Sequence, residues 1–260
     1  MEDTPISTVI LEEAQAGLRA LALHSDGSLA TLREGPASEI CGWCDALRDK
    51  GALRTVGAMP DRVSPRAIPC PPLPEALPEP GPGGAILLPG LRQKTPIEDV
   101  SPAMALRLGG LLAADPEFDG VACLTGPQGL WAHLSAGEVV SVLRVASIAA
   151  HAALNGPLPS AAPDAGFDTA LSDCLSRPER LLRFLGSPGH DTAAQAGAVI
   201  GAELAAAKPW WLGQRVRVLG QNGWPALYAH ALGMQGVPVV AGDGDAALIA
   251  GLSALSQRGA

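Results

Sequence analysis

The chain has 260 residues, 47% of them hydrophobic, which is enough for one large or two ordinary domains with their own cores. Eighteen basic and twenty-six acidic residues give a formal net charge of −8, and no Lys/Arg cluster suited to a phosphate backbone is present, which argues against a nucleic-acid partner. No apolar run approaches the roughly 18 residues that span a bilayer, and the first residues, MEDTPISTVILEE, are acidic where a signal peptide is positive. We therefore expect a cytoplasmic protein with no membrane partner.

Five cysteines, at positions 41, 44, 70, 123 and 174, do not resemble a disulfide framework and fit a reducing compartment. Cys41-Gly-Trp-Cys44 has the spacing of a redox motif. A thioredoxin-type site follows a strand in a βαβ unit, however, and a zinc site needs a second pair of ligands. We interpret the two residues as ordinary thiols on a helix, Glu39–Arg48.

The amino-terminal region predicts the start of a mixed sheet. Thr8–Leu11, Leu18–Leu23 and Leu29–Leu32 read as strands of a meander, and Ser25-Asp26-Gly27 supplies a turn between the last two.

A proline-rich stretch, Ile68–Gly84, follows later in the chain. Because proline lacks the amide donor and fixes φ, this stretch cannot form a helix or a central strand, and we expect an extended surface connector. Ala85–Leu88 then reads as a short buried strand. Ser101 and Pro102 form a favourable helix start before Ala103–Ala113.

A second α/β unit is predicted from about residue 117. Val121–Leu124 is a short strand that ends at Thr125-Gly126-Pro127, and Val139–Leu154 is apolar enough for a buried helix preceded by a strand. A loop and two helices with apolar spacing near 3.6 follow: loop Ala162–Phe167, helix Ala170–Leu185 and helix Thr192–Ala207.

The tail has the layout of a parallel α/β unit. Strands, glycine turns and helices alternate in this order: Arg215–Leu219, Gly220–Gly223, Pro225–Leu232, Val237–Val240, Gly242–Asp245 and Ala246–Leu255. A parallel crossover needs a helix, and ligands of such units bind at the carboxyl ends of the strands. The tail therefore predicts a binding site.

Several stretches of the chain together carry a family resemblance. The strongest lie towards the carboxyl end: Phe167–Ala170, Gly197–Leu204 (GAVIGAEL), Leu219–Tyr228 and Ala241–Leu252. Weaker ones precede them: Ala58-Met59, Ile68–Pro72, Ile86–Leu91, Asp99-Val100, Gly126 and Trp131. In this order they resemble the 2-dehydro-3-deoxygalactonokinases. The resemblance implies ATP-dependent phosphorylation of a 2-keto-3-deoxy sugar acid, with ATP and Mg²⁺ as cofactors. It also implies an α/β, actin-like ATPase/sugar-kinase fold with two ribonuclease-H-like lobes around a cleft, which we place at residues 1–116 and 117–260.

The first loop departs from the family pattern. The family has Asp-Trp-Gly-Ser-Thr-Asn before Leu-Arg-Ala, whereas this chain has Glu12-Glu13-Ala14-Gln15-Ala16-Gly17 before Leu18-Arg19-Ala20. By its place in the motif, Glu12 is the candidate metal ligand, and a solvated turn is the alternative for Glu12 and Glu13. Loss of the glycine hinders a close approach of backbone to phosphate, and Glu13 would repel a phosphate that it faced.

Three further blocks have lost their polar groups. The family's Asp-Val-Met-Arg-Gly-Glu-Glu-Thr-Gln is Asp99–Arg107 here, Pro-Gly-Thr-His-Ser-Lys-Trp is Thr125–Trp131, and Thr-Gly-Glu-Leu is Ser147–Ala150. Phosphoryl transfer depends on positioning and on charge around the transferred group. The sequence therefore predicts that kinase activity is weak or absent, and no catalytic residue is assigned.

The candidate site residues fall into two sets beside Glu12. The residues expected to bind nucleotide are Gly126, Gly220, Gln221, Gly242, Asp243 and Asp245. The residues expected to bind the sugar acid are Asp99, Arg107 and Arg144. Asp243 and Asp245 could instead cap the following helix, and the arginines could lie on a solvated face or pair with carboxylates.

Three hypotheses about function remain. The chain is a working kinase with relocated chemistry, an inert sensor that binds a sugar acid or nucleotide, or a partner subunit of an active kinase. A homodimer is also compatible with the sequence. A partner would use Trp210-Trp211 or the proline-rich arm, because exposed indoles make strong interface contacts.

Overall fold

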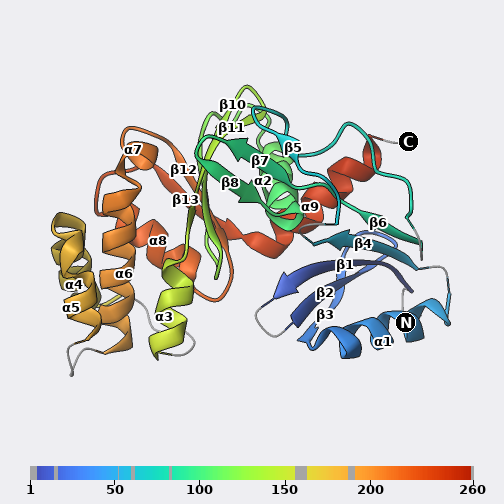
Figure 1. The fold of residues 1–260 in the computed structure, drawn as a ribbon, viewed down its shortest axis with the longest axis horizontal. Coiled ribbons are helices and arrows are strands. Elements are labelled where there is room, and N and C mark those ends of the chain that lie inside the picture. The colour runs from blue at the N-terminus through green and yellow to red at the C-terminus, as the bar shows by residue number, and fades with distance from the viewer. Residues whose placement is uncertain are drawn as a thin grey trace. The chain divides into compact units, whose positions relative to one another are not determined.

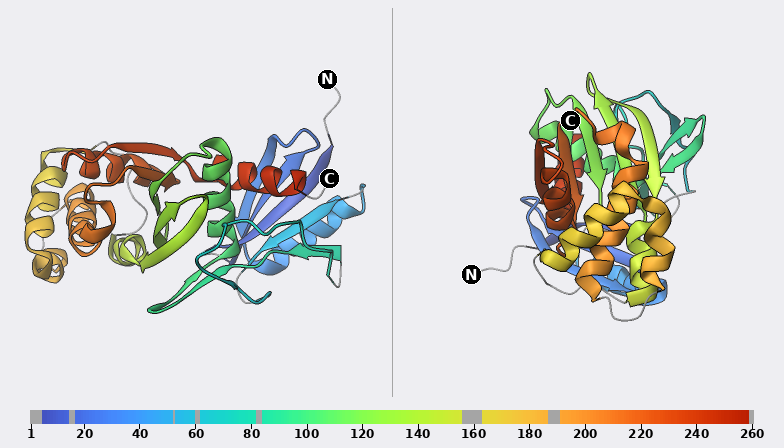
Figure 2. Two further views of the ribbon diagram at one scale, coloured as in Figure 1. Left: turned by 90° about the horizontal axis from the view of Figure 1, so that it is seen from above. Right: turned by 90° about the vertical axis from the view of Figure 1, so that its left-hand side faces the viewer.

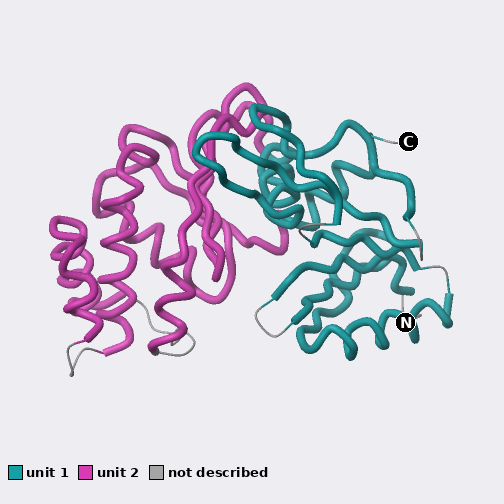
Figure 3. Tube along the Cα trace, viewed as in Figure 1, with its two compact units in different colours: residues 1–114, 248–260 teal, residues 115–247 magenta. Residues whose placement is uncertain are grey.

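The computed structural model describes residues 5–14, 17–51, 53–59, 62–81, 84–155, 163–186 and 191–258. The chain forms two compact units, which Figure 3 colours separately: residues 1–114 with 248–260 form unit 1, and residues 115–247 form unit 2. The last residues, expected with the second lobe, thus pack in unit 1. The assignment of residues 1–116 and 117–260 to two ribonuclease-H-like lobes stays a prediction.

Unit 1 is built on a five-stranded mixed sheet with the strand order β3-β2-β1-β4-β6. The strands are β1 (Ile6–Ala14), β2 (Gly17–His24), β3 (Leu29–Gly35), β4 (Arg54–Ala58) and β6 (Ala85–Leu87). The first three form an antiparallel meander, whereas β4 runs parallel to β1 and β6 parallel to β4. In the β2–β3 turn, the Asp26 carboxylate accepts a hydrogen bond from the Ser28 amide at 2.8 Å. The predicted meander, turn and mixed sheet are confirmed.

Alternate residues of this sheet face two separate apolar cores. Val9 and Leu11 pack with Ile40 and Cys44 of α1 (Ala37–Arg48), the predicted thiol-bearing helix, which lies along the sheet in Figure 1. The opposite face packs against α2 (Pro102–Ala114) and the end of α9 (Gly244–Gln257), through Ile10, Leu21, Leu106, Leu248 and Leu252. The predicted helix start also holds, because the Ser101 hydroxyl accepts a hydrogen bond from the Met104 amide at 3.2 Å.

The proline-rich stretch forms no α-helix and no strand of the main sheet in its described part. It is more than a surface connector, because Leu73 is only 3% exposed and belongs to the core with Leu106. Around it lies a three-stranded sheet that the sequence did not reveal: β5 (Arg66–Ala67), β7 (Leu91–Lys94) and β8 (Ile97–Val100). These strands are too short for a clear alternating pattern.

Unit 2 repeats the topology of the first sheet, with the order β11-β10-β9-β12-β13. Its strands are β9 (Gly120–Leu124), β10 (Gly129–Ser135), β11 (Glu138–Val145), β12 (Val216–Gly220) and β13 (Val239–Asp243). Strands β9 to β11 form a meander, and β12 runs parallel to both β9 and β13. The parallel α/β tail predicted from the sequence is confirmed, with each strand shifted towards the following turn.

The strand and following helix predicted over Val139–Leu154 are confirmed. Residues 138–145 form strand β11, and only α3 (Ser147–Asn155) is helical. Ala136 and Gly137 have positive φ and turn the chain between β10 and β11. A short apolar run of β-branched residues does not by itself distinguish a strand from a buried helix, and here strand pairing decides.

The helices of unit 2 also differ in detail from prediction. They are α4 (Ala165–Ser176), a 3-10 turn η2 (Pro178–Arg180), α5 (Leu181–Leu185), α6 (Thr192–Ala206), α7 (Lys208–Trp211) and α8 (Trp224–Gly233). The predicted helix Ala170–Leu185 breaks at Arg177, because Pro178 disfavours helical geometry before it. The loop predicted over Ala162–Phe167 is shorter, since Asp164 caps α4; Ala162 lies outside the described residues. Helix α6 matches its prediction and lies beside α4 in Figure 2.

In the described part of the chain, no helix combines the length and the apolar character that a membrane crossing requires.

Candidate functional site

Unit 2 gathers the predicted nucleotide residues at one edge of its sheet. Strands β9, β12 and β13 run parallel, so their carboxyl ends lie together. In the strand register Gly220 is opposite Asp243, and Leu219 is opposite both Leu124 and Gly242. Gly126 follows β9 directly, and Gln221 follows β12. The structure therefore places all six predicted residues at this edge or in the turns that leave it.

Gly220 is required by the close approach of two strand ends. A Cβ at Gly220 would overlap the Thr125 hydroxyl and lie 2.7 Å from the Thr125 carbonyl oxygen. The Thr125 amide donates to the Leu219 carbonyl oxygen at 2.7 Å, which extends the β9–β12 pairing beyond the last paired residues. A glycine here lets the ends of β9 and β12 pack closely, and Gly220 itself is buried beneath Thr125.

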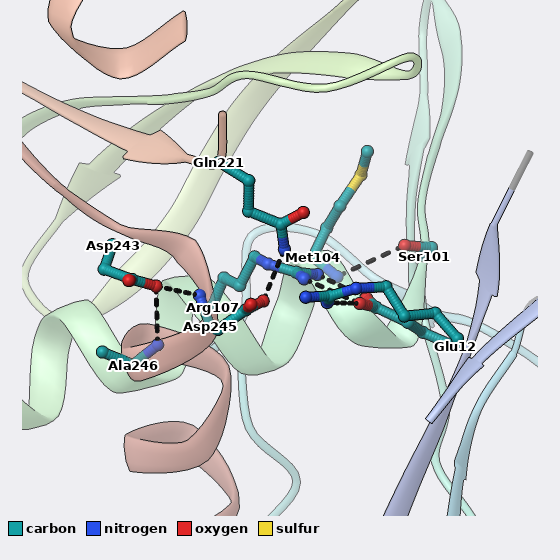
Figure 4. Close-up of polar contacts among 9 residues, drawn as sticks. Glu12, Ser101, Met104, Arg107, Gln221, Asp243, Asp245 and Ala246 are labelled. Atoms are coloured by element: carbon teal, nitrogen blue, oxygen red, sulfur yellow. Dashed lines mark hydrogen bonds and ion pairs between the residues drawn. The ribbon is translucent and has the colours of Figure 1, made fainter. Parts of the chain in front are cut away.

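Asp243 and Asp245 both take structural contacts at the start of α9 (Figure 4). The Asp243 carboxylate accepts hydrogen bonds from the amides of Asp245 at 2.7 Å and Ala246 at 3.1 Å. The Asp245 carboxylate accepts one from the side-chain amide of Gln221. Asp243 thus caps the helix, the simpler of the two interpretations from the sequence. Because its carboxylate uses two of the first amides, an anion would have to compete for them.

The glycine turn predicted over Gly242–Asp245 is wrong. Gly242 and Asp243 are the last residues of β13, and α9 starts at Gly244. The strand therefore passes directly into the helix. The cap from Asp243 makes this abrupt junction stable, since it satisfies amides that have no partner inside the helix.

Unit 1 holds the predicted metal ligand in a buried ion-pair network. Glu12 lies in β1 directly opposite Arg19 of β2, and its Oε1 accepts from Arg19 Nη1 at 2.6 Å. Arg107 of α2 donates to both carboxylate oxygens, from Nη1 at 2.8 Å and from Nη2 at 3.0 Å. Glu12 is 5% exposed, whereas its neighbour Glu13 is exposed. The solvated turn considered for this pair is therefore wrong for Glu12.

Charge pairing decides the ionisation of Glu12. Burial alone would raise the pKa of Glu12, but the positive charge of Arg107 and the hydrogen bonds from Arg107 and Arg19 outweigh it and hold the pKa below its ordinary value. The Glu12 carboxylate is consequently charged at neutral pH.

The residues predicted to bind a sugar acid do not share one set of contacts. Asp99 accepts two hydrogen bonds from Arg92, at 2.6 and 2.9 Å, on the half-exposed β7–β8 hairpin of unit 1. Arg144 of β11, in unit 2, donates to the side-chain oxygen of Gln128 at 2.8 Å. Arg107 pairs with Glu12, which is the carboxylate pairing considered from the sequence as an alternative to sugar-acid binding.

A family model for 2-keto-3-deoxy-galactonokinase matches residues 62–255. The chain belongs to this family. A search of curated proteins finds no match.

Among solved structures, three similar chains show the fold of this galactonokinase family member. A Sinorhizobium meliloti protein described as a 2-dehydro-3-deoxygalactonokinase is 19% identical, with a TM-score of 0.77 and 96% of each chain covered. The activator of 2-hydroxyisocaproyl-CoA dehydratase from Clostridium difficile, with bound ADPNP, is 9% identical, with a TM-score of 0.53, and covers 96% of this chain and 95% of its own. Component A of the Acidaminococcus fermentans (R)-2-hydroxyglutaryl-CoA dehydratase is 12% identical, with a TM-score of 0.52 and coverage of 97% and 99%. The predicted actin-like ATPase/sugar-kinase fold is confirmed.

Glu12 does not fit the Mg²⁺ that a kinase of this family implies. Both carboxylate oxygens of Glu12 accept hydrogen bonds from arginines, whereas Mg²⁺ needs a carboxylate oxygen at about 2.0–2.1 Å within an octahedral shell. Within the described ranges, no group of three or more His, Cys, Asp or Glu side chains could hold a metal ion. All five cysteines are free thiols, and on α1 Cys41 is exposed whereas Cys44 is buried.

Sequence reasoning missed a second buried carboxylate in this family member. Glu203 of α6 is 5% exposed and accepts hydrogen bonds from Trp131 Nε1 at 2.8 Å and from the Tyr228 hydroxyl at 2.6 Å. Burial raises the pKa of Glu203 despite these hydrogen bonds. A lone glutamate in the otherwise apolar run GAVIGAEL is the signal that could have revealed it, because an unpaired carboxylate is rarely buried. The cluster ties β10, α6 and α8 together.

Trp211 is not available as an interface residue. It is 3% exposed, and its indole Nε1 donates to the Leu204 carbonyl oxygen at 2.8 Å. Of the predicted tryptophan pair, only Trp210 is partly exposed.

Proposed function

We infer that this chain binds a nucleotide at the carboxyl ends of β9, β12 and β13, and that its transfer of a phosphoryl group from ATP to a 2-keto-3-deoxy sugar acid is slow or lost. The observation that carries the nucleotide part is the edge at which the carboxyl ends of the three parallel strands meet, where Gly220 closes β12 and the half-buried Gln221 follows it. Ligands of open parallel α/β sheets bind outside these strand ends.

Further support for nucleotide binding comes from the fold relatives. The 2-hydroxyisocaproyl-CoA dehydratase activator, which shares the fold, holds ADPNP, an analogue of ATP. Gln221 is half-buried at this edge, and its side-chain amide is held by Asp245. A side chain held in this way can orient a hydroxyl or a base edge without a large loss of entropy on binding.

The loss of transfer is supported by the state of Glu12. Phosphoryl transfer needs charge stabilisation around the transferred group, and the metal supplies much of it. The one metal ligand predicted from the sequence is committed to Arg19 and Arg107. The residues proposed to hold the sugar acid, Asp99, Arg107 and Arg144, remain a proposal, since each already has a side-chain partner.

Nucleotide binding is tested by thermal unfolding with ADPNP. A ligand that binds only the native state stabilises it by about 2.7 kcal/mol at a concentration of 100 times its Kd, which raises Tm by several degrees. We expect the shift in the wild type, a smaller one in Gln221→Ala, and an unchanged one in Gln235→Ala, which replaces an exposed glutamine in the turn after α8. Absence of a shift in the wild type at saturating ADPNP would overturn the nucleotide part.

An active kinase is the second candidate, because the family model covers residues 62–255. Purified protein with ATP, Mg²⁺ and 2-keto-3-deoxygalactonate distinguishes the two. We expect ADP formation no faster than ATP hydrolysis without the sugar acid. Turnover that depends on the sugar acid and is lost in Asp243→Ala or Asp99→Ala would instead establish the kinase. ADPNP binding without turnover leaves a sensor or a partner subunit as the role.

A further inference from the structure

We propose that Arg107 supplies at Glu12 the positive charge that a divalent cation supplies in a metal-dependent site, so that Glu12 binds no metal ion in this protein. The contact geometry motivates this. Arg107 presents two parallel N–H groups to the two oxygens of Glu12, at 2.8 and 3.0 Å (Figure 4). This fork satisfies both oxygens together, which a bidentate arginine does better than any other side chain.

A second arginine completes the neutralisation of the carboxylate. Arg19 lies directly across from Glu12 on β2 and donates to Oε1 at 2.6 Å. A divalent cation in contact with Glu12 would therefore lie beside two guanidinium groups and would have to displace at least one of them. The side chains of Arg19 and Arg107 are only 9% and 13% exposed, so bulk water screens such a repulsion weakly.

Glu13, the second carboxylate in the loop sequence, does not assist Glu12. Successive side chains of a strand point to opposite faces of the sheet, and in β1 Glu12 is buried whereas Glu13 is exposed. Glu12 would thus be the one carboxylate that β1 offers to a cation, with water in other coordination positions, an arrangement that Mg²⁺ accepts in proteins.

The fork is held in place by a well-packed helix. Arg107 lies between Leu106 and Leu108, which are 1% and 0% exposed, and Leu106 belongs to the core formed by β1, β2 and the end of α9. Movement of the guanidinium away from Glu12 would leave a buried carboxylate without two of its donors. The packing of α2 therefore favours the paired position of Arg107.

This inference goes beyond the proposed function, because it concerns Glu12 whether or not a nucleotide binds. The test therefore contains no nucleotide. Mn²⁺ serves as the probe, since its electron paramagnetic resonance signal disappears when the ion is bound, and thermal unfolding is measured with MgCl₂ against NaCl of equal ionic strength. In the full-length wild type we expect no loss of signal attributable to Glu12 and no Mg²⁺-specific change of Tm.

Three variants locate the effect. Arg107→Gln removes the charge and should gain Mn²⁺ binding and a Mg²⁺-dependent rise of Tm. Arg107→Lys keeps a positive charge and should gain neither. The double variant Glu12→Gln/Arg107→Gln should lose what Arg107→Gln gained. If Arg107→Gln gains no Mn²⁺ binding, Arg107 does not stand in for a cation and the proposal is wrong.

A wild-type protein that binds Mn²⁺ through Glu12 would also overturn the proposal. Such binding would disappear in Glu12→Gln. Should Glu12→Gln fail to fold, paramagnetic broadening in the wild type decides the matter: Mn²⁺ that broadens the amide resonances of Glu12 and Arg19 contradicts the proposal, and Mn²⁺ that leaves them sharp supports it.

Discussion

Replacing Glu12 by alanine should be among the most destabilising single changes in unit 1. The variant removes a carboxylate that accepts three hydrogen bonds from two arginines. Among these three residues the net charge rises from one positive charge to two, on side chains that are 9% and 13% exposed. The guanidinium groups then remain largely desolvated without this partner.

The size of the effect follows from burial and distance. A pair of unit charges about 4 Å apart interacts by about 4 kcal/mol at an effective dielectric of about 20, and desolvation offsets part of it. Removal of one partner of a buried pair usually costs about 3–5 kcal/mol. We expect a loss of this size for Glu12→Ala, which is a large share of the roughly 5–15 kcal/mol that holds a typical domain folded. Glu13→Ala, the neighbouring exposed carboxylate, should change stability by less than about 0.5 kcal/mol.

Urea unfolding followed by far-ultraviolet circular dichroism measures both variants. The pKa of Glu12 is lowered in the folded state, so its stabilisation is present above the unfolded pKa of about 4.3 and is lost as the pH falls through the folded value. The difference between wild type and Glu12→Ala should therefore shrink in acid. A Glu12→Ala variant as stable as Glu13→Ala at neutral pH would refute the reasoning.

Three further predictions concern other parts of the chain. Gly197→Ala should lower the free energy of unfolding by about 1–3 kcal/mol, because the new Cβ would meet the backbone of Phe167 in α4. Gly42→Ala, whose Cβ would have no atom within 4 Å, should stabilise α1 by up to about 1 kcal/mol. Equal effects of the two variants in urea unfolding would contradict this reasoning. The pKa of Glu203 is raised in the folded state, so its contribution to stability is fully present below the unfolded pKa and is lost as the pH rises through the folded pKa. Glu203→Gln does not titrate and should therefore become more stable relative to the wild type as the pH rises. A difference in stability between the two proteins that does not change with pH would argue against the raised pKa. Asp243→Ala should lower the free energy of unfolding by about 1 kcal/mol, because the cap of α9 is lost, and Asp243→Asn should lower it much less. If thermal unfolding shows the same loss of stability for both variants, the cap is not the cause.

Several elements could be predicted from sequence because local signals determine them. The meander of β1 to β3 follows from short apolar runs and the Ser-Asp-Gly turn, and α2 follows from Ser101 at its N-cap. The helix predicted over residues 170–185 should have been ended before Pro178, since proline disfavours helical geometry in the residue before it. The boundary between β11 and α3 was not predicted, because the valine-rich run fits either structure until β10 is available to pair with it.

The sequence alone determined the family, the repeated α/β plan and the glycines at the ends of β9, β12 and β13, since these depend on residue order and backbone freedom. It did not determine the state of Glu12. The two carboxylates of the loop look equivalent in sequence, and only the pleat of β1 makes Glu12 buried and Glu13 exposed. Arg107, 95 residues away, becomes its partner only when α2 packs on the sheet. A charge's environment depends on tertiary neighbours, so the pairing of Glu12 with two arginines is visible only in the folded chain.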